Sequence, residues 1–258
     1  MRRPFRQGLQ LTGAYTLAKQ DNFNRSYTIP EFNDRNWRPA GRVHVFSSSF
    51  VYLLPWQMGR GSGGILKAIV NDWQVNGIFQ VYSGGHFTVS GDNDEINSQG
   101  VSQTADLVGP VVRLGHIGDP AQPGPDGVFG TSDDVNGCLL CDNPGPYFDP
   151  YAWAQPTGQR LGTTTLNQFT GPGATNLDMS VFRAVPLGGN RRLEIRLEAN
   201  NVLNSVKYSN PNGGVNYDTF RTNPDGSRTI DNPDFLVVDG FANNYISRQV
   251  RVGLRFSY

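Results

Sequence analysis

The chain has 258 residues, and its 22 Lys and Arg balance its 22 Asp and Glu, so the formal net charge is zero. This balance excludes the basic excess by which nucleic-acid-binding proteins are identified. No run of about 18 apolar residues exists, which excludes a transmembrane helix, but strands of a membrane barrel give a much weaker signal. The low mean hydropathy, −0.43, is therefore compatible with a membrane barrel.

The amino terminus carries the positive charges of a signal peptide but lacks an apolar core, because Gln7, Gly8 and Gln10 interrupt it at once. If the protein is exported, we expect its targeting signal to be missing from this sequence.

Six segments alternate between apolar and polar residues, which is typical of strands with one apolar and one polar face. They are residues 7–18, 42–54, 72–82, 175–187, 192–199 and 248–258. In the second segment Phe46, Phe50, Tyr52 and Leu54 are in phase, but Val43, Val45 and Val51 blur the alternation, so its facing stays open. Gly188, Gly189 and Asn190 predict a tight hairpin turn between the fourth and fifth strands.

The polar faces of the last two strands are charged. Four consecutive positions on one face of a strand cannot be buried in a dry core when all are charged, so we expect this face to line a water-filled lumen. The predicted lumen-facing residues are Arg192, Glu194, Arg196, Glu198, Arg251 and Arg255.

Three long polar segments, 19–41, 84–173 and 202–247, are predicted to be loops, with a short strand at His86–Ser90. A structureless loop as long as 84–173 is uncommon, so this segment is expected to be a folded cap or binding loop. If the last strand ends on the periplasmic side, the hairpin turn and the connector 55–71 lie inside, and the three long loops lie outside. Short turns inside and long loops outside is the rule for outer-membrane barrels.

Several phrases resemble one family in order and spacing. They are WQVNGIFQVYSGGHFTVSG (73–91), YFDPYAWAQP (147–156), GPGATNLDMSVFRAVPLG (171–188), RRLEIRLEANNVLNSVKYSNPN (191–212) and the final strand. Together they resemble Oar-like TonB-dependent receptors, which implies a barrel of about 22 strands with an N-terminal plug, energised through TonB. The resemblance implies that residues 1–258 are the C-terminal part of such a barrel, from a truncated gene or an incomplete sequence, without plug or early strands.

The expected fold is therefore all-β: an antiparallel, up-and-down transmembrane β-barrel segment of about six strands, open if isolated, with long extracellular loops. The final strand resembles the closing strand of bacterial outer-membrane barrels, whose terminal aromatic residue is read by the barrel-assembly machinery. Its apolar positions, which would form this assembly signal, are Val250, Val252, Leu254, Phe256 and Tyr258.

Two clusters lie within residues 84–173. Asp126, Asp133 and Asp134 gather around glycines and suit Ca²⁺, although they match no EF-hand spacing, so an Asp/Gly turn without metal remains the alternative. Cys138 and Cys141 form a lone CxxC, for which a disulfide in an exported loop is favoured over a zinc site that would need two further ligands.

The leading hypothesis is a non-enzymatic segment of an outer-membrane transporter, with membrane lipid, the plug, the early strands, TonB and the assembly machinery as partners, and without nucleic acid or cofactor. The competing hypothesis is a secreted β-sandwich for binding or adhesion, which would hide its apolar faces between two sheets. A hydrolase has only three scattered histidines, His44, His86 and His116, in its favour.

Overall fold

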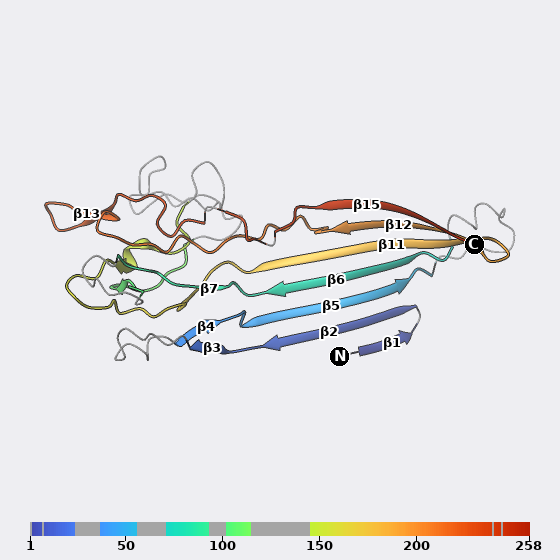
Figure 1. Cartoon of the computed structure of the whole chain (residues 1–258), viewed down its shortest axis with the longest axis horizontal. Helices are drawn as coiled ribbons and strands as arrows, with labels where there is room; N and C mark the ends of the chain where they lie inside the picture. The colour runs from blue at the N-terminus through green and yellow to red at the C-terminus, as the bar shows by residue number, and fades with distance from the viewer. Residues whose placement is uncertain are drawn as a thin grey trace.

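The structure is a computed structural model that describes residues 2–6, 8–23, 37–55, 71–92, 102–114, 145–238, 240–243 and 245–258. One seven-stranded sheet, in the order β1-β2-β5-β6-β11-β12-β15, dominates it (Figure 1). Its strands are β1 (Arg2–Arg6), β2 (Leu9–Leu17), β5 (His44–Leu53), β6 (Gln74–Tyr82), β11 (Ala174–Gly188), β12 (Arg191–Asn200) and β15 (Gln249–Ser257). All neighbours pair antiparallel and follow sequence order, which confirms the all-β, up-and-down architecture.

The sheet includes β1, for which the sequence pattern predicts no strand, so it has seven strands where about six are expected. The backbone of β1 pairs with β2, with Arg3 opposite Leu11 and a shift in register before Arg6, and Gly8 turns the chain at φ +80°. The segment escaped prediction because RRPFR has no apolar alternation and contains Pro4, which cannot donate to a ladder. The first predicted strand therefore has a neighbour on both sides.

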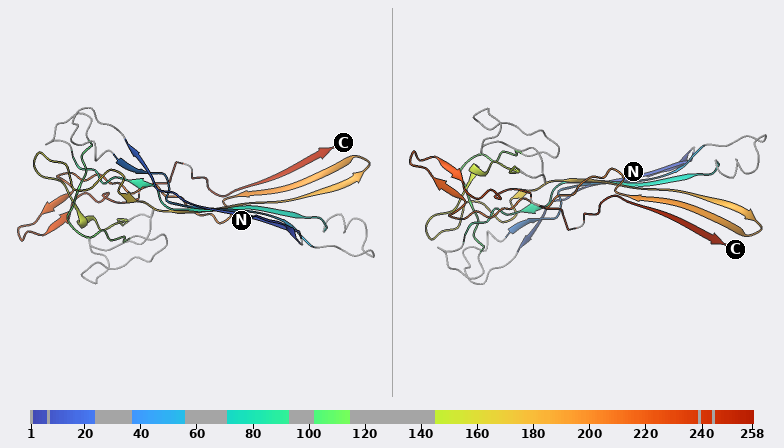
Figure 2. Two further views of the ribbon diagram at one scale, coloured as in Figure 1. Left: turned by 90° about the horizontal axis from the view of Figure 1, so that it is seen from below. Right: turned by 90° about the horizontal axis from the view of Figure 1, so that it is seen from above.

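The sheet is a single open layer. Seen edge-on, β11, β12 and β15 diverge from β2, β5 and β6 toward the end of the sheet that carries the short turns (Figure 2). No second sheet packs face to face on it within the described ranges, so the β-sandwich alternative is wrong. The same part of the chain contains no helix long and apolar enough to cross a membrane.

The long segments are folded at the opposite end of the sheet, and we call their described residues within 84–173 and 202–247 the cap (Figure 1). The buried apolar cluster found among the described residues lies in the cap and includes Trp153, Phe169, Val89 and Leu236. The small elements of the cap are β7 (His86–Phe87), β8 (Asp106–Leu107), η2 (Pro150–Ala152), β9 (Trp153–Ala154), β10 (Phe169–Thr170), β13 (Phe220–Thr222) and β14 (Arg228–Ile230).

Two loop predictions need correction. Segment 19–41 carries a two-stranded ribbon, β3 (Gln20–Phe23) with β4 (Trp37–Ala40), in which Phe23 lies opposite Trp37. Segment 202–247 contributes the hairpin β13–β14 and buried residues such as Phe235. Polar composition concealed both. The ribbon β3–β4 pairs within itself and accepts a hydrogen bond from Asn167 at the Pro39 carbonyl, and Arg228 of β14 donates to the Trp153 carbonyl.

Candidate functional site

The apolar side chains of the sheet form continuous rows across its strands. Val75 lies opposite Val181, which lies opposite Leu197, which in turn lies opposite Val252. At the edge of the sheet no described part of the chain covers these side chains, and Val252 is 73% exposed. We call this side, which carries Leu9, Leu11, Phe50, Tyr52, Val75, Phe79, Val181, Ile195, Leu197 and the apolar residues of β15, the apolar face.

Register settles the facing of β5. Phe50 lies opposite Leu11 on one side and Gly77 on the other, so Phe46, Phe50 and Tyr52 belong to the apolar face. A Cβ built on Gly77 would lie 2.3 Å from the Phe50 ring, so this glycine leaves the room that the ring occupies. Val45 and Val51, which blurred the alternation, lie on the opposite face with Ser47 and Ser49.

Aromatic residues stand near both ends of the apolar face. Near the cap, the Tyr15 hydroxyl is 2.7 Å from His44 Nδ1, and the rings of Phe46 and Phe79 meet edge to face. At the other end Phe256 stacks on Tyr258. Two aromatic girdles around an apolar band are the arrangement by which outer-membrane barrels sit at both membrane interfaces.

Arg183 interrupts the apolar face, and the sequence pattern did not identify it. It lies opposite Ile195 in register and is only 3% exposed. Arg183 is two residues from both Val181 and Val185 on the same strand, and this spacing could have placed it on the apolar face.

The opposite, polar face carries the predicted charge ladder, and the register brings its two halves together. Glu198 lies opposite Arg251, Arg196 opposite Gly253, Glu194 opposite Arg255, and Arg192 opposite Ser257. The six predicted residues thus lie on one face of two adjacent strands. Whether that face lines a lumen remains a prediction.

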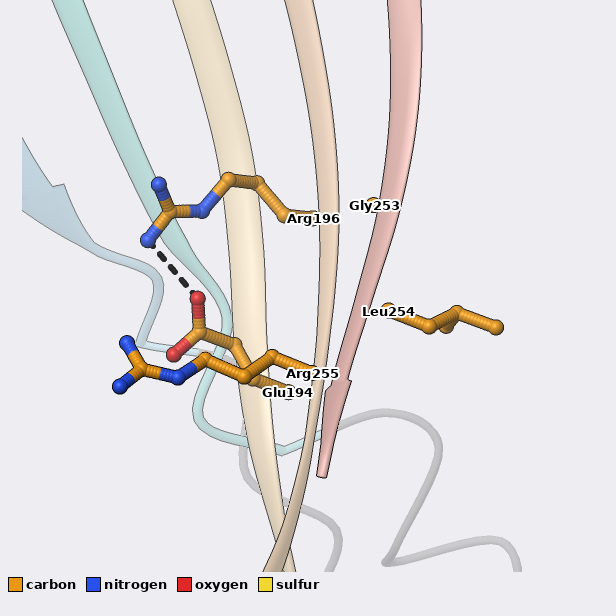
Figure 3. A pocket seen from close by; sticks show the side chains of 5 residues that line it. All are labelled: Glu194, Arg196, Gly253, Leu254 and Arg255. Carbon is orange, nitrogen blue, oxygen red and sulfur yellow. Dashed lines mark hydrogen bonds and ion pairs between the residues drawn. The ribbon is translucent and has the colours of Figure 1, made fainter. Parts of the chain in front are cut away.

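Arg196 occupies the centre of this ladder. Its guanidinium donates to Glu194 Oε1 at 2.7 Å and to Glu198 Oε1 at 3.3 Å, and it lies 5.6 Å from the ring centre of Phe182. Figure 3 shows Glu194, Arg196 and Arg255 projecting to one side of the strands and Leu254 to the other. Gly253 has no side chain, and together with Glu194, Arg196 and Arg255 it leaves an open hollow beside the Arg196 stem.

A polar network in the cap surrounds the buried carboxylate of Asp106. Arg160 forms a two-pronged ion pair with Asp106, and the Thr163 amide also donates to that carboxylate at 3.0 Å. The hydrogen bond from Arg160 is the main cause that holds the pKa of Asp106 below its ordinary value, against the opposing effect of burial. Gly162 allows a close approach here, because a Cβ would lie 1.9 Å from the Thr104 carbonyl oxygen.

Asn201 fixes the junction between the sheet and the cap. It is 2% exposed and adopts a left-handed backbone (φ +50°), which asparagine tolerates better than most residues. Its side-chain amide donates to the carbonyls of Ser205 and Ile246, and its backbone N–H donates to the Asp178 carboxylate at 2.8 Å. The phrase ANNVLN therefore has a local structural role, which the sequence interpretation had not assigned.

The other predicted sites fall outside the described residues. This holds for the calcium candidates Asp126, Asp133 and Asp134 and for Cys138 and Cys141. In the part of the chain that the structure describes, no group of three or more His, Cys, Asp or Glu could hold a metal ion.

The predicted assembly-signal residues lie on β15 and just beyond it, at an edge of the sheet. Val250, Val252, Leu254 and Phe256 are all exposed on the apolar face, and Tyr258 is 93% exposed. Strand β15 is the last strand of the sheet and pairs with β12 on one side, so its other side is an edge of the sheet.

Comparison with known proteins gives one family. A model described as "Outer membrane beta barrel domain" matches residues 1–230, which is most of the chain. No curated protein and no solved structure matches. The exposed apolar face fits this family, since membrane lipid would cover it. The chain therefore belongs to the outer membrane β-barrel domain family, and its location is the bacterial outer membrane.

Proposed function

We propose that the chain is the C-terminal barrel segment of an Oar-like TonB-dependent outer-membrane receptor, that it acts without catalysis, and that its cap lies on the extracellular side and contributes to ligand capture. The cap carries this proposal most directly. Phe87 and Val89 from one family-like phrase pack with Tyr147, Phe148 and Trp153 from another, in a single buried cluster. Phrases that are far apart in the sequence thus have a common structural reason to occur together.

The orientation follows from the arrangement of connections. The turn at Gly188–Gly189 and the turn at Gly8 lie at one end of the sheet, and the cap lies at the other (Figure 1). In outer-membrane barrels short turns are periplasmic and long loops extracellular. The polar face would then line the lumen and contact a plug, and the edges of β1 and β15 would pair with the remaining strands, since unpaired backbone groups at membrane depth cost several kcal/mol each.

The test is the reading frame upstream of Met1 in the source genome, followed by genetics. We expect it to encode a signal peptide, a plug and the earlier strands, and we expect photocrosslinkers placed in the segment that precedes the plug to capture TonB. A strain without TonB should then show the same growth defect as a strain without the receptor. An upstream frame that encodes a closed barrel without a plug would refute the proposal while leaving the barrel family intact.

A further inference from the structure

The polar face of the last two strands carries arginine in a regular order. In the four consecutive rows formed by β12 and β15, the arginine is Arg251, then Arg196, then Arg255, then Arg192. Each row therefore has one arginine, and the arginine alternates between the two strands. We call these four residues the arginine track.

The track extends over most of the membrane. Residues on one face of a strand are about 6.8 Å apart along its axis, so four rows span roughly 20 Å. The apolar band of an outer-membrane barrel is about 25 Å tall. The two ends of the track lie near the cap and near the short turns, because β15 runs from Gln249 beside the cap to Ser257 beside the hairpin.

The polar face of the four central strands, β2, β5, β6 and β11, is almost uncharged. Strands β2, β5, β6 and β11 present mainly hydroxyl, amide and small side chains there, and their one charged residue, Asp178, accepts the amide of Asn201. The strip that carries the four arginines of the track also carries two glutamates, Glu194 and Glu198, and both pair with Arg196. The described residues therefore give this strip a net positive charge.

We infer that the arginine track binds small oxyanions, carrying phosphate or carboxylate groups, as they pass along the barrel wall. Guanidinium groups recognise such groups by paired N–H donors. Conduction requires sites that bind well enough to admit an ion and weakly enough to release it. Regular spacing provides successive sites, and Glu194 and Glu198 lower the positive potential at the centre, which suits passage better than permanent occupation. The inference rests on the proposed lumen-facing side of the sheet but not on TonB.

The test is a binding titration of the full-length protein that the source gene encodes, purified in detergent micelles, with inorganic phosphate as the ligand and phosphorus NMR as the readout. Two exposed charge pairs of ordinary strength correspond to about a fivefold change in affinity. We expect R251Q/R255Q to weaken phosphate binding by about that factor, and E194Q/E198Q to strengthen it, because Arg196 is released. Gln74→Ala, on the polar face of β6, is the matched control and should bind as the wild type does.

Circular dichroism and heat-modifiable migration in gels report whether each variant retains the sheet. If R251Q/R255Q does not fold, R251K/R255K keeps the charge and should retain most of the binding. Absence of binding by the wild type, or equal affinity of the arginine and glutamate variants, overturns the inference. Repeating the titration after deletion of the segment that precedes the barrel strands separates the occupants. Binding only after this deletion would show that a polypeptide segment covers the track, which also overturns the inference. Because no arm involves TonB, failure here leaves the proposed function standing.

Discussion

The sheet and the cap are stabilised in opposite ways. The cap buries Trp153 and Leu236 completely and surrounds them with other apolar residues, as a water-soluble domain does. The sheet leaves Val252 and Leu254 exposed, each by more than 70%, although its backbone ladder is continuous from β1 to β15. The two regions therefore suit different surroundings. The cap is stabilised by the exclusion of water from its core, whereas the sheet needs lipid on one face. The comparison predicts that substitutions should damage one region and spare the other.

The largest effect is expected in the cap core. Trp153→Ala removes a fully buried side chain that meets the Phe148 and Phe169 rings edge to face, and such truncations cost about 3–5 kcal/mol. The cap should become sensitive to protease, while the amount of protein in the outer membrane stays the same. Leu107→Ala is the matched control, because Leu107 lies opposite Trp153 in the β8–β9 pair but is 37% exposed. A loss of membrane insertion in Trp153→Ala would show that the two regions are not independent.

The next effect separates the faces of the sheet. Ile195→Arg places a charge on the apolar face, where an arginine at mid-bilayer costs about 2–4 kcal/mol, and it does so opposite Arg183. Glu194→Arg changes a residue on the polar face, where water should solvate the new charge. Insertion, measured as heat-modifiable protein in the outer-membrane fraction, should fall much further for Ile195→Arg. Equal tolerance at the two positions would mean that the lipid and lumen faces are assigned wrongly.

A smaller effect is expected from the polar network of the cap. Asp106→Asn removes the charge that Arg160 and Thr163 bind, and hydrogen bonds to charged groups contribute about 2 kcal/mol. Because the pKa of Asp106 is lowered in the folded cap, its contribution is present above the pKa of the unfolded chain and is lost as the pH falls through the lower, folded value.

Hydrogen exchange of the cap amides measures this effect. The wild type should be better protected than Asp106→Asn at pH 7, and the difference should disappear on strong acidification. A difference that persists in acid would indicate that the asparagine disturbs packing rather than removing a charge interaction.

The smallest effect on stability is expected at the carboxyl terminus. The Tyr258 ring stacks on Phe256 and is almost fully exposed, so Tyr258→Ala should hardly change the assembled sheet. If Tyr258 belongs to an assembly signal, the variant should still reach the outer membrane in several-fold lower amount in the full-length receptor, measured by surface labelling. Tyr151→Ala, which also removes an exposed tyrosine but lies in the cap, is the control. Unchanged surface levels of Tyr258→Ala would count against the signal.

The sequence by itself determined most of the sheet. Six of its strands, the hairpin at Gly188 and Gly189, and the separation of apolar from polar faces could be predicted, because alternation along a strand is local and has a fixed period of two. It also determined that Arg192, Glu194, Arg196 and Glu198 share a face, since they are two residues apart on one strand.

Only the tertiary structure decided how strands face one another and how the cap is built. The alternation of arginines between β12 and β15 depends on a register in which Arg196 meets Gly253, and no pattern within either strand fixes that register. The burial of Arg183 beside Ile195 and the pairing of β1 with β2 likewise depend on the neighbouring strand. The cap core joins Phe87, Trp153 and Phe235 across long stretches of sequence, and its short elements are stable because those distant contacts exclude water together.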